Sequence, residues 1–395
     1  MSTDLTFCSP SNLPWYQGRP ASPAVRAGDL LFISGQIALD VAGDVLAGGD
    51  VRAQARLAFE SVQALVESAG GRMADVVDVM SFHSDVREMD GVFEVAREFF
   101  SGDYPAWTPV GAVGLQAPGA LVSIRAIAHL GPEAKHCHTP DTIAWWRRLP
   151  ISAGCRKGSL AFIGGQVAAD PDGEVTVPGD HAAQSRYAFN RIREVLAGLG
   201  GSLDDVIDLL SFHQDARGMA DGGEVQRALF QDVPKGEVPA WTAIGTPGLY
   251  RPGLLACWRA IADLAEGPRI AKTPDSLWWK IDPISGGTRK KGGSLIAISG
   301  EVASDGDGEI TTPGDTAAQA RYAFNRIREV LAQFDVGMDR IVEVTSFHKD
   351  PRAWEVVMDV GKGYFSAEGP AWTPVGTTGL FREGYLHEIY ALAVV

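Results

Sequence analysis

Two short motifs each occur three times in this chain, in the same order and roughly 130 residues apart. SFHSD, SFHQD and SFHKD begin at Ser81, Ser211 and Ser346, and PAWTPVG, PAWTAIG and PAWTPVG begin at Pro105, Pro239 and Pro370. This period is the length of a small domain and exceeds the about 20–50 residues of a solenoid repeat. The sequence therefore predicts three tandem domains, at residues 1–135, 136–270 and 271–395.

Each copy has the pattern of an α+β domain. In the first copy, apolar runs predict strands at residues 30–38, 76–83, 106–113 and 120–130, and helical periodicity predicts helices at residues 50–71 and 91–100. Asp50, Asp180 and Asp315 are the expected N-caps of the long helices. A sheet with both helices on one face leaves its other face uncovered. We therefore expect the three copies to pack as an intramolecular pseudo-trimer around a central β-barrel-like core.

Aromatic residues recur in the segments that lead into each copy. They are Trp15, Tyr16, Trp145, Trp146, Trp278 and Trp279. One interpretation is that they pack neighbouring domains together. The other is that some of them line a ligand pocket between domains.

Composition narrows the expected partners and location. The formal net charge is −14, and an acidic surface repels phosphate backbones, so nucleic acid is not an expected partner. No stretch reaches the ~18 apolar residues of a membrane span, and the N-terminal residues lack the pattern of a signal peptide. We expect a cytoplasmic protein that binds a small molecule and does not bind a membrane, and the sequence leaves further self-association open.

The cysteines suggest free thiols. Cys8, Cys137, Cys155 and Cys257 form no CxxC pair and do not recur at matching repeat positions, a pattern that favours a reducing compartment. His136, Cys137 and His138 form a short cluster of metal-binding residue types, but they lie in a polar linker and have no counterpart in the other copies. The sequence predicts no metal and no organic cofactor.

The repeated motifs carry a resemblance to a known family. Each copy resembles the RidA/YjgF/UK114 family of imine deaminases over almost its whole length. The matching pieces are ISGQ at Ile33, AQAR at Ala53, the strand ending in SFHSD, EFF at Glu98, and PAWTPVG followed by VSIRAIA at Val122. The resemblance implies a chorismate mutase-like fold and trimers with a ligand cleft at each subunit interface, which here would lie between copies.

The chain departs from this family at two positions that carry chemistry. Family deaminases hold the substrate carboxylate with an arginine after Pro-Ala, a role that suits the bidentate guanidinium. The equivalent residues here are Trp107, Trp241 and Trp372. The family's final-strand glutamate, thought to orient the attacking water, aligns with Arg125, Arg259 and Tyr390. The resemblance therefore implies a diverged site.

Three histidines are candidates for a general base. His83, His213 and His348 are each followed two residues later by Asp85, Asp215 and Asp350. Residues i and i+2 of a strand lie on the same side, so a carboxylate would fix the tautomer of the imidazole and raise its pKa. The alternative is structural: each histidine ends a strand and each aspartate caps the following turn.

The three tryptophans are candidates for ligand recognition. They would give each cleft a flat apolar surface for an aromatic, apolar or cationic ligand, beside the hydroxyls of Thr108, Thr242 and Thr373. The alternative is that they pack the interfaces.

The third copy carries acids of its own. Glu301 replaces Gln36 and Gln166, and Glu388 replaces Ser123 and Cys257, two residues before Tyr390. Two carboxylates and a phenol would form one acid–base site, with Arg125 or Arg259 of another copy as partner or substrate ligand. Unrelated surface or ion-paired acids are the alternative. A nucleophilic role for Cys155 or Cys257 is not favoured, because no base is evident beside them.

Two functions follow from these residues. The first is an enzyme that hydrolyses or otherwise transforms a C–N bond (imine, enamine or amide-like) of a small metabolite, aromatic ones included, at the inter-repeat clefts. The second is a non-catalytic pseudo-trimer that binds a small hydrophobic ligand or a protein. The acids of the third copy favour the enzyme, and loss of the family arginine and glutamate favours the binder. A ribonuclease, a label attached to the family, is disfavoured by the acidic balance. Chorismatase-like hydrolases are a more remote comparison, because three RidA-like repeats remain recognisable.

Overall fold

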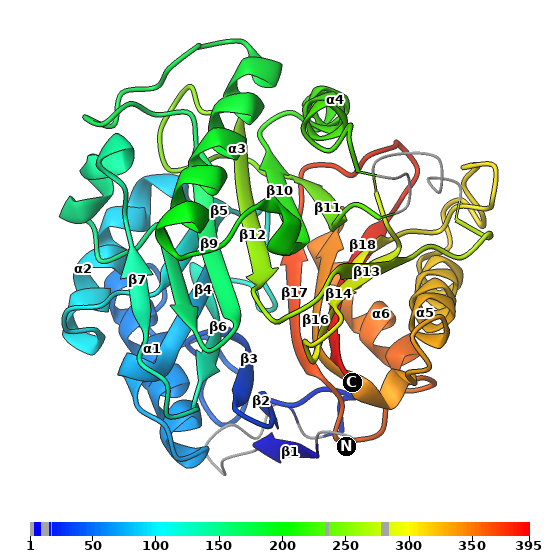
Figure 1. The fold of residues 1–395 in the computed structure, drawn as a ribbon. Helices are drawn as coiled ribbons and strands as arrows, with labels where there is room; N and C mark the ends of the chain where they lie inside the picture. The colour runs from blue at the N-terminus through cyan, green and yellow to red at the C-terminus, as the bar shows by residue number, and fades with distance from the viewer. Residues whose placement is uncertain (1–3, 9–15, 17, 234–236, 278–283) are drawn as a thin grey trace.

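The computed structural model describes residues 4–8, 16, 18–233, 237–277 and 284–395, which form three units, each a six-stranded sheet with two helices (Figure 1). Unit 1 contains β1 (Leu5–Cys8), β2 (Ala24–Ala27), β3 (Leu30–Gln36), α1 (Val51–Ser68), β4 (Val76–His83), α2 (Met89–Phe99), β5 (Ala106–Gly111) and β6 (Val122–His129). Unit 2 contains β7 (His136–His138), β8 (Gly154–Lys157), β9 (Leu160–Val167), α3 (His181–Gly198), β10 (Val206–His213), α4 (Met219–Leu229), β11 (Ala240–Gly245) and β12 (Ala256–Asp263). Unit 3 contains β13 (Arg269–Lys272), β14 (Gly287–Lys290), β15 (Leu295–Glu301), α5 (Thr316–Ala332), β16 (Ile341–His348), α6 (Trp354–Gly361), β17 (Ala371–Gly376) and β18 (His387–Val394).

The three sheets share one topology, which confirms the predicted α+β repeat. In unit 1 the strand order is β1-β2-β3-β6-β4-β5, and the other two sheets repeat it. The pair formed by β4 and β5 is parallel, and the other neighbours in this sheet are antiparallel. The predicted N-caps are confirmed, since the side chains of Asp50, Asp180 and Asp315 each accept a hydrogen bond from the first turn of a long helix. The short strands β1 and β2, and their equivalents, were not predicted.

The units are joined in a closed ring. Single parallel bridges pair Ala106 of unit 1 with Ser152 of unit 2, and Ala240 of unit 2 with Ser285 of unit 3. A third bridge pairs Ala371 of unit 3 with Ser22 near the start of unit 1. Because the last unit returns to the first, one chain forms the expected pseudo-trimer. None of the described helices is long and apolar enough to cross a membrane.

Phenylalanines and buried charges fill the centre of this ring. Phe82, Phe212 and Phe347 pack edge to face around one another, with ring centroids 6.2–6.4 Å apart. Next to them lie three acidic residues and three polar partners, all fully buried: Asp78, Asp208, Glu343, Arg125, Arg259 and Tyr390. These six residues are called the axial cluster below.

Each polar partner in the axial cluster bonds to an acid of another unit. Arg125 of unit 1 forms two hydrogen bonds with Glu343 of unit 3, as well as one with Asp78 of its own unit. Arg259 of unit 2 donates to Asp78 of unit 1 at 2.9 Å, and the Tyr390 hydroxyl of unit 3 donates to Asp208 of unit 2 at 2.8 Å. Burial raises the pKa of Asp208 to about 6. The cluster therefore ties all three units together.

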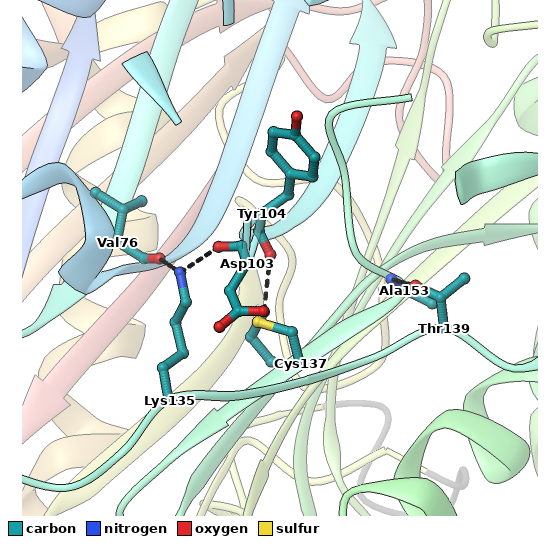
Figure 2. The surroundings of a disulfide bond; sticks show 8 residues. Val76, Asp103, Tyr104, Lys135, Cys137, Thr139 and Ala153 are labelled. Carbon is teal, nitrogen blue, oxygen red and sulfur yellow. Dashed lines mark hydrogen bonds between the residues drawn. A yellow bond between two sulfur atoms is a disulfide. The ribbon is translucent and has the colours of Figure 1, made fainter. Parts of the chain in front are cut away.

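The linker between units 1 and 2 is covalently fastened, which corrects the free-thiol prediction. Strand β7 pairs with β8 in a register that places Cys137 opposite Cys155, and the two form a disulfide. Beside it, Lys135 Nζ donates to the carbonyl oxygens of Val76 and Asp103 (Figure 2). The prediction failed because the linker showed no strand pattern, so nothing placed the two cysteines on neighbouring strands. Cys8 and Cys257 are free.

The axial cluster predicts that two substitutions lower the free energy of unfolding by different amounts. Arg125→Met leaves Asp78 and Glu343 buried without their main partner, and breaking a buried ion pair in this way costs about 3–5 kcal/mol of unfolding free energy. Tyr390→Phe removes one hydrogen bond to Asp208 and should cost about 1–3 kcal/mol. Urea denaturation of both variants measures the difference. Equal costs would contradict the role of Arg125 as the link between units 1 and 3.

The disulfide predicts sensitivity to reduction. It closes a loop with a sequence separation of 18 residues, so removing it should lower the free energy of unfolding by about 3 kcal/mol. Calorimetry of the double variant Cys137→Ser/Cys155→Ser should show a lower melting temperature, which a reductant does not lower further. A wild-type melting temperature that is unchanged by reductant would contradict the bond.

Candidate functional site

Equivalent residues meet at each of the three junctions between units. At each junction the penultimate strand of one unit (β5, β11 or β17) packs against the third strand of the next (β9, β15 or β3), and the last strand of that next unit lies beside this third strand. The residue on the last strand is Cys257 at the junction of units 1 and 2, Glu388 at the junction of units 2 and 3, and Ser123 at the junction of units 3 and 1. One fold thus offers three clefts with different chemistry, as a covalent pseudo-trimer permits.

At the junction of units 1 and 2, aromatic side chains almost fill the space beside Cys257. Tyr250 stacks on Trp145 with a 9° angle between the rings and packs against Phe93. Its hydroxyl donates to Asp90 at 2.7 Å. The cavity that remains beside Cys257 has a volume of about 20 Å³, and a separate hollow of about 460 Å³ at the same junction is lined by Arg87, Asp90 and Tyr250, among others. Here the linker tryptophans Trp145 and Trp146 pack neighbouring units, while Trp15, Trp278 and Trp279 lie outside the described residues.

Hydrogen bonds link the described residues at the junction of units 3 and 1. The amide of Gln116 donates to the carbonyl oxygen of Gly35, and the Gly35 N–H donates to Thr373 Oγ1 at 2.7 Å. The Gln36 amide donates to Ser34 and to the hydroxyl of Tyr16. The amide nitrogens of Gln36 and Gln116 are therefore bonded to the protein itself, whereas Ser123 Oγ and Gln116 Oε1 have no hydrogen-bond partner among the described residues.

The junction of units 2 and 3 contains a cavity of about 240 Å³. Two small residues of α4 line this space: Gly223 stands where Phe93 stands on α2, and Ala220 stands where Asp90 stands. The counterpart of Tyr250 is Phe381, which has no hydroxyl to anchor it. The inner wall of the cavity consists of Trp241, Ala243, Ser299, Val302, Tyr385 and Glu388.

Glu388 is the buried carboxyl of this cavity. Its side chain is 5% exposed, and burial raises its pKa to about 8, although a hydrogen bond from the Ala243 N–H lowers it somewhat. The residues equivalent to Ala243 are Pro109 and Pro374, which have no N–H to donate. The carboxyl and its backbone donor, which come from different units, therefore occur together at this junction alone.

Glu301 lies near Glu388 and is fully buried. Burial raises its pKa well above the ordinary value, which favours the protonated form of this carboxyl. Within the described part of the chain neither of its oxygens has a hydrogen-bond partner, whereas the amide of Gln166 at the equivalent position donates to two carbonyl oxygens. Tyr390 belongs to the axial cluster, as do Arg125 and Arg259, so the predicted site of Glu301, Glu388 and Tyr390 is not assembled around the cavity.

The predicted His–Asp pairs do not form. Asp85 accepts from the backbone and side chain of Arg87 and caps the turn Val86–Glu88, and Asp215 and Asp350 do the same with Arg217 and Arg352. Each histidine is fully buried, and burial lowers the pKa of His83 to about 3 and those of His213 and His348 well below the ordinary value. The structural alternative is correct, because the arginine two residues further on captures each aspartate.

Each histidine instead supports the tryptophan of its unit through a serine. In unit 2, His213 Nε2 hydrogen-bonds to Ser211 Oγ at 2.8 Å, and Ser211 Oγ accepts from Trp241 Nε1 at 2.8 Å. Units 1 and 3 repeat this arrangement. Unit 2 alone extends it, since His213 Nδ1 lies 2.9 Å from Nε2 of His181, whose position is held by Val51 and Thr316 in the other units.

The predicted ligand-binding residues divide into two groups. Trp107 and Trp372 are buried in aromatic clusters with helix residues, and only Trp241 lines a described cavity. Thr242 and Thr373 accept backbone N–H groups of the next unit, so they join units. Thr108 is buried at the junction of units 1 and 2.

Sequence reasoning missed two residues that shape the cavity. Ala243 differs from proline in the printed repeat strings PAWTAIG and PAWTPVG, and Gly223 lies in the pair Gly222–Gly223 on α4. Both signals were visible as differences between copies. Their meaning depended on knowing which residues face one another across a junction.

Among the described residues, no three His, Cys, Asp or Glu side chains lie together in a way that could hold a metal ion. Of the predicted linker cluster, Cys137 is in the disulfide and His136 Nε2 contacts the Gly198 carbonyl oxygen. Cys257 is buried, and burial raises its pKa to about 12, so a thiolate is not available there.

The raised pKa of Glu388 predicts a pH-dependent stability difference. The folded state holds a proton that the unfolded chain, with an ordinary pKa of 4.5, releases. Stability from this group is therefore complete below pH 4.5 and is lost as pH rises to about 8. The free energy of unfolding of Glu388→Gln, relative to that of the wild type, should therefore rise by up to about 1.4 kcal/mol per pH unit between pH 5 and 8. Urea denaturation at four pH values tests this, and a constant difference would contradict it.

Comparison with known proteins matches the three units separately. The sequence profile described as Endoribonuclease L-PSP matches residues 18–130, 147–262 and 287–395. A crystal structure of a YjgF/YER057c/UK114 family member from Mycobacterium tuberculosis is 30% identical, covers 32% of this chain and 99% of its own, and has a TM-score of 0.28. The YjgF gene product of E. coli is also 30% identical, over 31% of this chain and 98% of its own, with a TM-score of 0.29.

One similar structure extends across the repeats. A chorismatase covers 82% of this chain and 94% of its own, with a TM-score of 0.56 and 14% identity, which is a likeness of fold. The three profile matches together span most of the 395 residues. This chain therefore belongs to the Endoribonuclease L-PSP family, which includes the YjgF/RidA proteins, and carries three tandem copies of its domain.

Proposed function

We propose that the junction of units 2 and 3 is the active site of a hydrolase that acts on the C–N bond of a small imine or enamine. The observation that carries the proposal is Glu388, a buried carboxyl with a raised pKa that lines a cavity of about 240 Å³. Functional carboxyls are often tuned in this way by burial. The family membership supports the reaction class, and the chorismatase likeness supports the fold alone.

Glu388 would act first as an acid and then as a base. Because its pKa is about 8, it carries a proton at pH 7 and donates it to the imine nitrogen. The carboxylate that results is stabilised by the Ala243 N–H and accepts a proton from water as the water oxygen bonds to the imine carbon. Collapse of this adduct breaks the C–N bond, releases ammonia and leaves a carbonyl compound.

The other two junctions would serve structure. Cys257 and Ser123 hold no proton that titrates near neutral pH, and aromatic or amide side chains occupy the space beside them. In this scheme His83, His213 and His348 hold tryptophans in place, and the axial cluster joins the units.

The test is ammonia release from imines generated in situ. Glu388→Gln should lower kcat at least about 100-fold, the usual contribution of one acid–base group. The matched control is Cys257→Ser at the equivalent position of a closed junction, which should keep the wild-type rate. An unchanged rate in Glu388→Gln, with folding verified by circular dichroism, would overturn the assignment.

Binding without turnover is the second candidate function. It is favoured by Trp241, which replaces the arginine that holds the substrate carboxylate in the resembling deaminases. In that case thermal stabilisation by a ligand would occur without any product. A ribonuclease activity is opposed by the net charge of −14, which repels a phosphate backbone.

A further inference from the structure

We propose that the cavity between units 2 and 3 selects a small apolar amine or imine that carries a positive charge and no carboxylate. This inference rests on the proposed site but concerns what the site binds. The inference depends on which polar atoms line the inner wall and which of them already form hydrogen bonds within the protein.

The inner wall is mostly hydrocarbon. Ala243, Val302 and Trp241 are each less than 9% exposed, and the Trp241 N–H groups are both taken, the indole by Ser211 Oγ and the backbone by Ser299 Oγ at 2.9 Å. Ser299 Oγ in turn donates to the Ser285 carbonyl oxygen at 2.6 Å. Apart from Glu388 and the Tyr385 hydroxyl, which has no hydrogen-bond partner among the described residues, the wall presents mainly carbon to a ligand, which favours an apolar body.

Trp241 is held rigidly in this wall. It stacks on Trp258 with ring centroids 5.4 Å apart and an angle of 20° between the rings. Its indole N–H donates to Ser211, which is hydrogen-bonded to His213, and His213 is hydrogen-bonded to His181. A Cβ at Gly223 would lie 3.4 Å from the Trp241 ring. The indole therefore cannot turn its N–H toward a carboxylate, and the room above it depends on the glycine.

Among the described residues, the inner wall has one carboxyl that can take up a negative charge. This is Glu388, with Tyr385 beside it, and burial raises the pKa of the nearby Glu301 well above its ordinary value. The other charged residues of the lining, among those that the structure describes, are Glu224 and Arg227, which are exposed on α4 at the rim and have opposite signs. A cation placed against Glu388 would gain a buried ion pair, whereas a carboxylate placed there would meet like charge or a desolvated acid.

The size of the cavity limits the ligand. Its volume of about 240 Å³ is below the about 300–1,000 Å³ of typical drug-sized sites. A single ring with a short aminomethyl arm is therefore a suitable probe. Benzylammonium combines that shape with one positive charge and undergoes no hydrolysis.

Calorimetry with benzylamine and benzoate at pH 7 tests the inference. Benzylammonium should bind at least ten-fold more tightly than benzoate and should release close to one proton per chain, because the cation displaces the proton of Glu388. Glu388→Gln should weaken benzylammonium binding at least ten-fold and abolish the proton release. Gly223→Phe, which installs the residue that unit 1 has at this position, should abolish binding, and Cys257→Ser should change nothing.

The outcomes separate this inference from the proposed function. Tighter binding of benzoate, or benzylammonium binding that survives Glu388→Gln, would overturn the selectivity. If benzylammonium binds as expected but no imine is hydrolysed, the inference stands and the catalytic proposal fails. If imines that carry a carboxylate react as fast as cationic imines that lack one, the inference fails and the catalytic proposal stands.

Discussion

Closure of the ring around a buried charged centre is the constraint on which the rest of this structure depends. Three sheets present apolar faces to one axis, where three phenylalanines pack together. Beside them three acids meet two arginines and one tyrosine, and each polar partner reaches an acid of a neighbouring unit. Buried charges are tolerated only when they are paired, so each unit needs both of the others.

This constraint also explains where function is free to change. A change in the axial cluster affects all three units at once, whereas a change at one junction affects a single cleft. The chain uses that freedom unequally. Aromatic packing fills the space beside Cys257 at one junction, and hydrogen bonds link the described residues of a second. The third has a cavity beside Glu388, lined by Gly223 and Ala220 where larger side chains stand in unit 1. Glu388 and its backbone donor Ala243 occur at that same junction.

The repeat pattern was enough to predict the units, and residue type alone was not enough to predict the site. Strand β4 was predicted with its observed bounds, because a run of apolar residues between turn signals is a local property. The pairing of Cys137 with Cys155 was missed because it depends on a linker strand that has no strong pattern. His83 and Asp85 were expected to interact. Instead, the guanidinium of Arg87 hydrogen-bonds to the Asp85 carboxylate, a contact that the strand pattern does not predict.

Arg125 is a second residue whose location could not be predicted from its type and its place in the repeat. Its alignment with a residue of the final strand suggested a role in a cleft, while the structure places it on the axis, bonded to Glu343 more than 200 positions away in sequence. Alternation along a strand indicates which side a residue occupies, but not which unit covers that side. Glu388, two residues from Tyr390, lines a cavity whose opposite wall is formed by α4 and β11 of unit 2.

The most direct test of the account is a crystal structure of the protein soaked with benzylamine. The account predicts one ligand per chain, at the junction of units 2 and 3, with its nitrogen within hydrogen-bond distance of Glu388 and its ring beside Trp241. A ligand at either of the other junctions, or a cavity at units 2 and 3 that stays empty at saturating amine, would contradict the claim that a single junction has kept the site.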